Sequence, residues 1–163
     1  MTAALFYHLM RMEARGVVQT LAARALDAGW RVALRVPDGG RADWWDTALW
    51  QGAEDGFFPH GLAGGPHDAD QPLLIVTDAA PPANGARYLM AVDSAPVDPA
   101  EVARFQRVAV LFDGNDPAAL EAARGQWRRL TGAGVAAQYW AEDGGRWVKK
   151  AEAGGAAGGK TGG

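Results

Sequence analysis

The stretch AALFYHL, residues 3–9, is a short apolar run with two aromatic residues, and it predicts a buried β-strand. Apolar residues then recur at helical spacing over residues 14–28, and Gly29 stands where that helix should end. The run WRVALRV, residues 30–36, predicts a second buried strand that Pro37 closes. A strand, a helix and a strand in this order indicate an α/β fold with a parallel sheet.

The rest of the chain continues the alternation. We expect further helices over 41–50 and from a cap at Asn115 or Asp116 to about Leu130, and further strands over 73–77, 87–92, 107–112 and 134–140. The predicted fold class is α/β, with a three-layer, mainly parallel or mixed central sheet flanked by helices. It is Rossmann-like without a nucleotide site. We expect one domain over residues 1–150 and a disordered Gly/Ala-rich tail over 151–163.

The charge of the protein is small, negative and unevenly placed. Sixteen Lys and Arg against 19 Asp and Glu give a net charge of −3, which argues against broad binding to nucleic acid. Residues 124–150, however, hold six basic and only two acidic residues, which predicts one local site for an acidic partner. There is no cysteine, no apolar run long enough for a membrane span and no signal-peptide pattern, so we expect a soluble cytoplasmic protein.

The segment GGAAGGKTGG, residues 154–163, matches the phosphate-loop pattern G-x-x-x-x-G-K-[ST] through Gly154, Gly159, Lys160 and Thr161. A working phosphate loop follows a buried strand and opens a helix, whose N-terminus faces the phosphates. Nothing hydrophobic directly precedes this segment, and only two residues follow Thr161. We therefore interpret the match as a product of low complexity.

Other patterns of catalysis or metal binding are also weak. The first strand-to-helix turn has no glycine before Gly16, so it lacks the dinucleotide pattern G-x-G-x-x-G. The spacing of His60, His67 and Asp68 is not that of a known metal site. Ser94 is the only serine and has no nucleophile-elbow pattern around it. We expect no catalytic residue, no metal and no cofactor, and hence a protein that acts by recognition.

Two aromatic stretches are candidates for recognition. In DTALWQGAEDGFFPHGL, residues 46–62, Trp50 and Phe57 stand on either side of a polar, glycine-bearing spacer. These aromatic residues could fold back over the sheet as core, or could form an exposed patch that docks a protein partner, since Trp is enriched and Phe common among interface anchors.

In ARGQWRRLTGAGVAAQYW, residues 123–140, Arg124, Trp127 and Arg128 share one helix face. Two guanidinium groups around an indole suit an acidic peptide that carries an apolar or aromatic residue. The alternative is an ordinary amphipathic helix in which Trp127 covers the core and the arginines are solvated.

These stretches, in this order, resemble the chi subunit of bacterial DNA polymerase III holoenzyme. The resemblance covers residues 3–150 and rests on FYHL, on ALW followed by FFPHGL, on ARGQWRRLTGAG with QYW, and on GRWVKK. It implies a non-enzymatic α/β protein that links the clamp-loader complex to single-stranded-DNA-binding protein (SSB), whose acidic tail ends in an aromatic residue with a free carboxylate.

The resemblance also implies roles for single residues. Arg124, Trp127 and Arg128 would bind the SSB tail, and Trp50 and Phe57 would face the psi subunit or another clamp-loader component. Gln126 replaces a position that is often basic in the family, and its side chain should point away from the tail. Two other classes remain open on sequence grounds: a small nucleotide-binding α/β enzyme with a degenerate phosphate loop, and a structural subunit whose basic C-terminal region touches nucleic acid directly.

Overall fold

Strand β1 lies inside the sheet, between strands that come more than a hundred residues later in the sequence. In the computed structural model, which describes residues 2–51 and 59–154, eight strands form one sheet in the order β3-β4-β2-β5-β6-β1-β7-β8. The strands are β1 (Ala3–Leu9), β2 (Val32–Arg35), β3 (His60–Leu62), β4 (Leu73–Val76), β5 (Tyr88–Ala91), β6 (Arg107–Asp113), β7 (Ala136–Asp143) and β8 (Arg146–Ala153).

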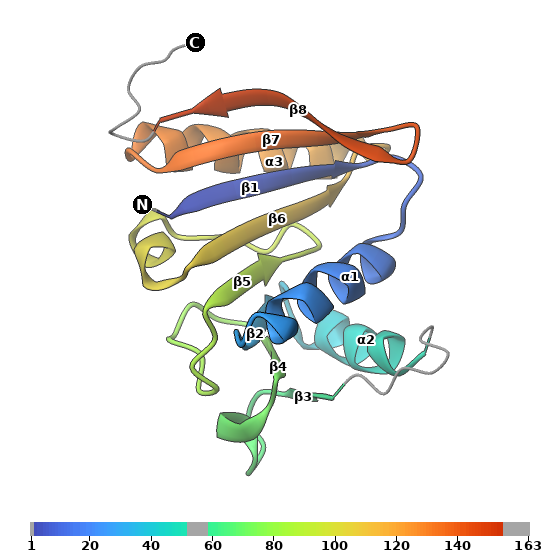
Figure 1. Cartoon of the computed structure of the whole chain (residues 1–163), viewed down its shortest axis with the longest axis vertical. Coiled ribbons are helices and arrows are strands. Elements are labelled where there is room, and N and C mark those ends of the chain that lie inside the picture. Colours follow the sequence, from blue (N-terminus) through green and yellow to red (C-terminus); the bar gives the residue numbers. More distant parts are fainter. Residues whose placement is uncertain (1, 52–58, 155–163) are drawn as a thin grey trace.

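The helices cover the two faces of this sheet unequally. They are α1 (Ala14–Asp27), α2 (Gly39–Trp50) and α3 (Pro117–Gly132), with short 3₁₀ turns η1 (Asp68–Asp70) and η2 (Pro99–Arg104). Helices α1 and α2 lie together on one side of the sheet, and α3 lies behind β7 on the other (Figure 1). The predicted three-layer α/β fold is therefore confirmed, with seven strands parallel to their neighbours and only β8 antiparallel.

Each face of the sheet has its own apolar core. The core under α1 and α2 includes Trp45, Leu34 and Met90, and the core under α3 includes Phe6, Phe112 and Leu130. Within the described residues, no helix combines the length and the apolar character needed to cross a membrane.

Two strands were not foreseen. Strand β3 has only three residues, and β8 is an edge strand whose residues are mostly exposed and half of them charged, so neither has the alternating or apolar pattern of a buried strand. Strand β8 reaches Ala153, so the boundary predicted at residue 150 is wrong for residues 151–153, which pair with β7. The rest of the predicted tail, including Gly159, Lys160 and Thr161, lies outside the described residues.

Candidate functional site

Helix α3 positions the residues that the sequence singled out. Asp116 caps the helix through a 3.0 Å hydrogen bond from the Ala118 N–H, and Pro117 occupies its first turn, as the sequence predicted. Ala123, Gln126 and Leu130 face inward and are buried. Arg124, Trp127 and Arg128 lie beside these buried positions on the helix. The structure brings their three side chains together around one surface pocket.

Trp127 has features of both alternatives that its sequence left open, since it covers the core and also lines a surface pocket. Its ring is partly buried and packs edge-on against Phe6, with ring centroids 5.3 Å apart, so it does cover the core. It also lines a surface pocket of about 380 Å³. Arg124 and Arg128 are exposed beside it. The indole is therefore held in place by the core and still presents a surface to solvent.

The opposite wall of this pocket comes from the β7–β8 hairpin, and sequence reasoning did not find it. Tyr139 of β7 and Lys150 and Ala151 of β8 complete the lining with the three α3 residues. We call this set of six residues the tail pocket, after the acidic SSB tail that the resemblance led us to expect here and not after the chain's own Gly/Ala-rich end. The QYW sequence of the strand was a signal for Tyr139, but nothing local indicated that Lys150 would lie opposite α3.

A network of rings and hydrogen bonds fixes Tyr139. Its ring packs edge-on against Trp127 and Phe112, each at a centroid distance of 5.9 Å, and its hydroxyl forms a 2.8 Å hydrogen bond with Nδ1 of His8. Burial and the nearby Arg124 cation lower the pKa of His8, while the Asp113 carboxylate opposes this shift. The lowered pKa favours the neutral form of His8 at pH 7, so the imidazole behind Tyr139 adds little charge next to the tail pocket.

The charge of the tail pocket is carried by its rim. Arg128 lies 3.6 Å from the Glu121 carboxylate, in an ion pair that is largely solvent-exposed. In the part of the chain that the structure describes, no acidic side chain forms an ion pair with Arg124 or Lys150. An aromatic floor with cations around it can hold a ring and carboxylates at the same time.

Gln126, next to these residues in sequence, points away from the tail pocket as expected. Its side chain is 5% exposed; it accepts a 2.9 Å hydrogen bond from the Val97 N–H and donates one of 3.1 Å to the Ala95 carbonyl. The role of Gln126 is thus to fasten α3 to the segment before η2.

The second predicted patch is described only in part. Trp50 is the last residue of α2 and is 46% exposed, and its ring lies 4.2 Å from that of His60 on β3. His60 is buried, with Nε2 3.1 Å from an Asp46 carboxylate oxygen. Phe57 lies outside the described residues, so the predicted pairing of Trp50 with Phe57 stays a prediction. No described cluster of His, Asp or Glu is suited to a metal ion.

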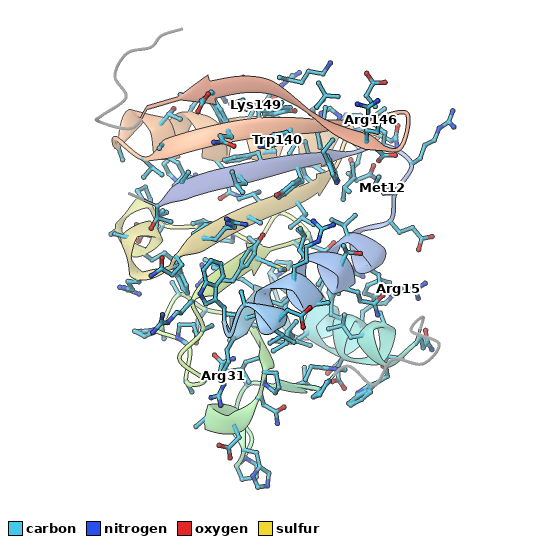
Figure 2. The ribbon with its side chains drawn as sticks, viewed as in Figure 1. Met12, Arg15, Arg31, Trp140, Arg146 and Lys149 are labelled. Carbon is cyan, nitrogen blue, oxygen red and sulfur yellow. The ribbon has the colours of Figure 1, made fainter. Side chains whose placement is uncertain are left out.

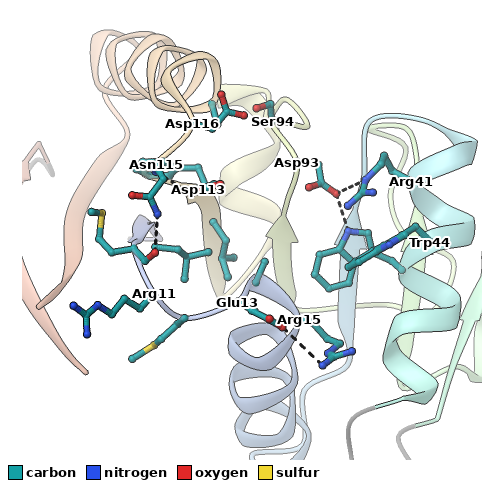
Figure 3. Close-up of a pocket in the computed structure, with 18 residues that line it drawn as sticks. Arg11, Glu13, Arg15, Arg41, Trp44, Asp93, Ser94, Asp113, Asn115 and Asp116 are labelled. Atoms are coloured by element: carbon teal, nitrogen blue, oxygen red, sulfur yellow. Dashed lines mark hydrogen bonds and ion pairs between the residues drawn. The ribbon is translucent and has the colours of Figure 1, made fainter. Parts of the chain in front are cut away.

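A separate crevice of about 680 Å³ opens where β1, β5 and β6 end (Figure 3). In an open α/β sheet this is where nucleotides bind, because strand ends and helix N-termini meet there. On the α2 side of the crevice, Arg41 and Trp45 both donate to one Asp93 oxygen, at 2.9 and 2.8 Å. Asp93 and Ser94 both have a positive φ, a backbone conformation that costs non-glycine residues energy.

In such a crevice, the loop after β1 would bind a phosphate through its backbone N–H groups. In this protein those N–H groups form hydrogen bonds with a side chain of the protein itself. The backbone N–H groups of Met10, Arg11 and Met12 all donate to Oε1 of Glu142, at 2.8, 2.9 and 3.0 Å. Burial opposes ionisation of this carboxyl, but the three N–H donors outweigh it and lower the pKa of Glu142. Because a carboxylate of the protein fills the anion-binding turn, the geometry disfavours the nucleotide-binding alternative.

The comparisons with known proteins bear on the family of the chain. Among curated proteins, none matches the chain. The family model described as DNA polymerase III chi subunit, HolC, matches residues 1–138, which include β1, all of α3 and the first residues of β7. The predicted resemblance is thereby confirmed over most of the chain, and the protein belongs to the DNA polymerase III chi subunit family.

Proposed function

We propose that this accessory subunit of DNA polymerase III is a non-catalytic cytoplasmic adaptor that links the clamp-loader complex to the acidic C-terminal tail of SSB. The observation that carries the proposal is the tail pocket, in which Arg124, Trp127 and Arg128 lie around one cavity. The pocket is lined by three basic residues and no acidic one in a protein with a net charge of −3, which favours an acidic ligand at this place over general binding to DNA.

The fit follows from the two parts of the ligand. The terminal aromatic ring of the tail would pack on Trp127 and Tyr139, whose own packing holds them in position. The carboxylates would pair with Arg124 and Arg128, whose guanidinium groups can donate two parallel hydrogen bonds to one carboxylate. Because Arg124 is exposed, screening by salt should weaken this part of the binding.

The clamp-loader side of the adaptor is proposed to be the patch around Trp50 and Phe57. Trp50 supports this assignment because this large aromatic residue is 46% exposed at the end of α2. An exposed Trp is a frequent anchor of protein interfaces. The partner would be the psi subunit or another clamp-loader component.

Fluorescence anisotropy of a labelled peptide with several acidic residues and a free C-terminal aromatic residue tests the tail assignment. We expect Arg124→Ala to weaken binding about 5–10-fold, and Arg124→Glu to weaken it further because it adds repulsion. Trp127→Ala should also weaken binding, with little change in its salt dependence. The matched control is Arg24→Glu, which reverses the charge of an exposed residue on α1. If folded variants of Arg124 and Arg128 bind the peptide with the affinity of the unchanged protein, the proposal is wrong.

A further inference from the structure

The β7–β8 pairing contains an irregularity beside the tail pocket. Tyr139 pairs with Ala151, whereas the next residue of β7, Trp140, pairs with Lys149, so the register shifts between them. Lys150 is thereby the extra residue of a β-bulge, and Lys150 and Ala151 together lie opposite Tyr139. A bulge bends its strand and redirects side chains, and such features are frequent beside functional sites.

The bulge determines which lysine reaches the tail pocket. Lys150 and Ala151 both line it, and the short Ala151 side chain leaves the space over Tyr139 open. Lys149, one residue earlier, pairs with Trp140, which lines a groove on the α1 side of the sheet. Figure 2 shows Lys149 and Trp140 together on the hairpin. The Lys149 ammonium donates to Glu152 at 2.9 Å, so the two neighbouring lysines have different surroundings.

We propose that Lys150 is a binding residue for the acidic peptide, supplying a third cation from the wall opposite Arg124 and Arg128. This inference rests on the proposed function and adds to it a part of the site outside the matched family region, because β8 begins eight residues after residue 138. A peptide with carboxylates on both sides of its ring would then be held between α3 and the hairpin.

The physical reason is geometric. Two arginines on one helix face can neutralise carboxylates only along that face of a bound peptide. A cation on the facing strand reaches carboxylates that point the other way. Among the described acidic side chains, none forms an ion pair with Lys150, so no such pair has to break when the peptide binds. The peptide ring between the walls excludes water from these pairs and strengthens them.

The test compares reversals of the two adjacent lysines in the full chain, with the labelled acidic peptide as the probe. Lys150→Ala should lower the affinity about 2–5-fold and Lys150→Glu about 10-fold or more, whereas Lys149→Glu should change it less than about 2-fold. Lys150→Arg should keep the affinity near that of the unchanged protein, because it preserves the charge. The salt dependence should become shallower in Lys150→Ala.

The outcomes separate this inference from the proposed function. If Arg124→Glu abolishes binding and Lys150→Glu does not change it, the inference about Lys150 is wrong and the proposed tail site stands. If Lys149→Glu and Lys150→Glu weaken binding equally, the effect is one of general charge and the inference also fails. If neither Arg124→Glu nor Lys150→Glu affects binding, the tail site itself is wrong. Circular dichroism of each variant verifies that the hairpin is folded.

Discussion

At the scale of single residues, Gln126 shows how a polar side chain can be part of the core. Its amide satisfies the Val97 N–H and the Ala95 carbonyl, both buried contacts. Gln126→Ala should lower the free energy of unfolding by about 1–3 kcal/mol, because both backbone groups lose a partner. Urea unfolding measures this loss, and Gln106→Ala, an exposed glutamine, should change stability by no more than about 0.5 kcal/mol. Equal effects would mean that the buried hydrogen bonds contribute little.

The same scale shows what the sequence could predict of the site. Arg124, Trp127 and Arg128 were found because helical spacing is a local property, so a shared face can be counted along the chain. Lys150 could not be found in that way. Its position depends on the pairing of β8 with β7 and on the bulge between them, and neither is encoded in the residues around Lys150 alone.

At the scale of elements, Glu142 ties the end of β7 to the loop between β1 and α1. Its folded-state pKa lies below the ordinary value of 4.5. The stabilisation is therefore present above pH 4.5 and is lost as the pH falls through the lowered folded-state pKa. Urea unfolding between pH 3 and 7 should show this loss. Glu142→Gln, which keeps Oε1 as an acceptor but removes the charge, should reduce the acid-induced loss of stability.

Glu142→Ala removes the acceptor as well and should cost about 2 kcal/mol at pH 7, because three N–H donors lose their partner. Glu152→Gln, on the exposed strand β8, serves as the control and should leave the pH profile unchanged. An acid profile of Glu142→Gln identical to that of the unchanged protein would contradict this role of Glu142.

At the scale of the whole molecule, the two proposed partner surfaces lie toward opposite edges of the sheet. Trp50 contacts His60 of β3 at one edge, and the tail pocket includes β8 at the other. Figure 1 shows the α2 end and the β8 hairpin far apart. If these surfaces are the binding sites proposed above, the two partners do not compete for space and both can bind at once. This arrangement depends on strand order, which sequence periodicity predicted only as a mainly parallel sheet, because periodicity identifies strands and not their neighbours.

Trp50→Ala should therefore weaken clamp-loader association by about 2 kcal/mol and leave the affinity for the acidic peptide unchanged. Titration of the clamp-loader component into each variant measures the first effect, and anisotropy of the labelled peptide, with and without that component, measures the second. Arg124→Glu should show the reverse pattern. Competition between the two partners, or a lowered melting temperature of Trp50→Ala without loss of clamp-loader binding, would contradict the assignment.

The place of β1 inside the sheet has a consequence for the order in which the chain folds. Phe6 pairs with Val110 on one side and with Tyr139 on the other, so both neighbours of β1 follow it by more than 100 residues. During synthesis β1 emerges before β6 and β7 and stays without these partner strands until they leave the ribosome. Contacts of such high order are slow to form, which makes docking of β1 a late step of folding. Until then its apolar residues are exposed, and the nascent chain is most open to aggregation and to capture by chaperones.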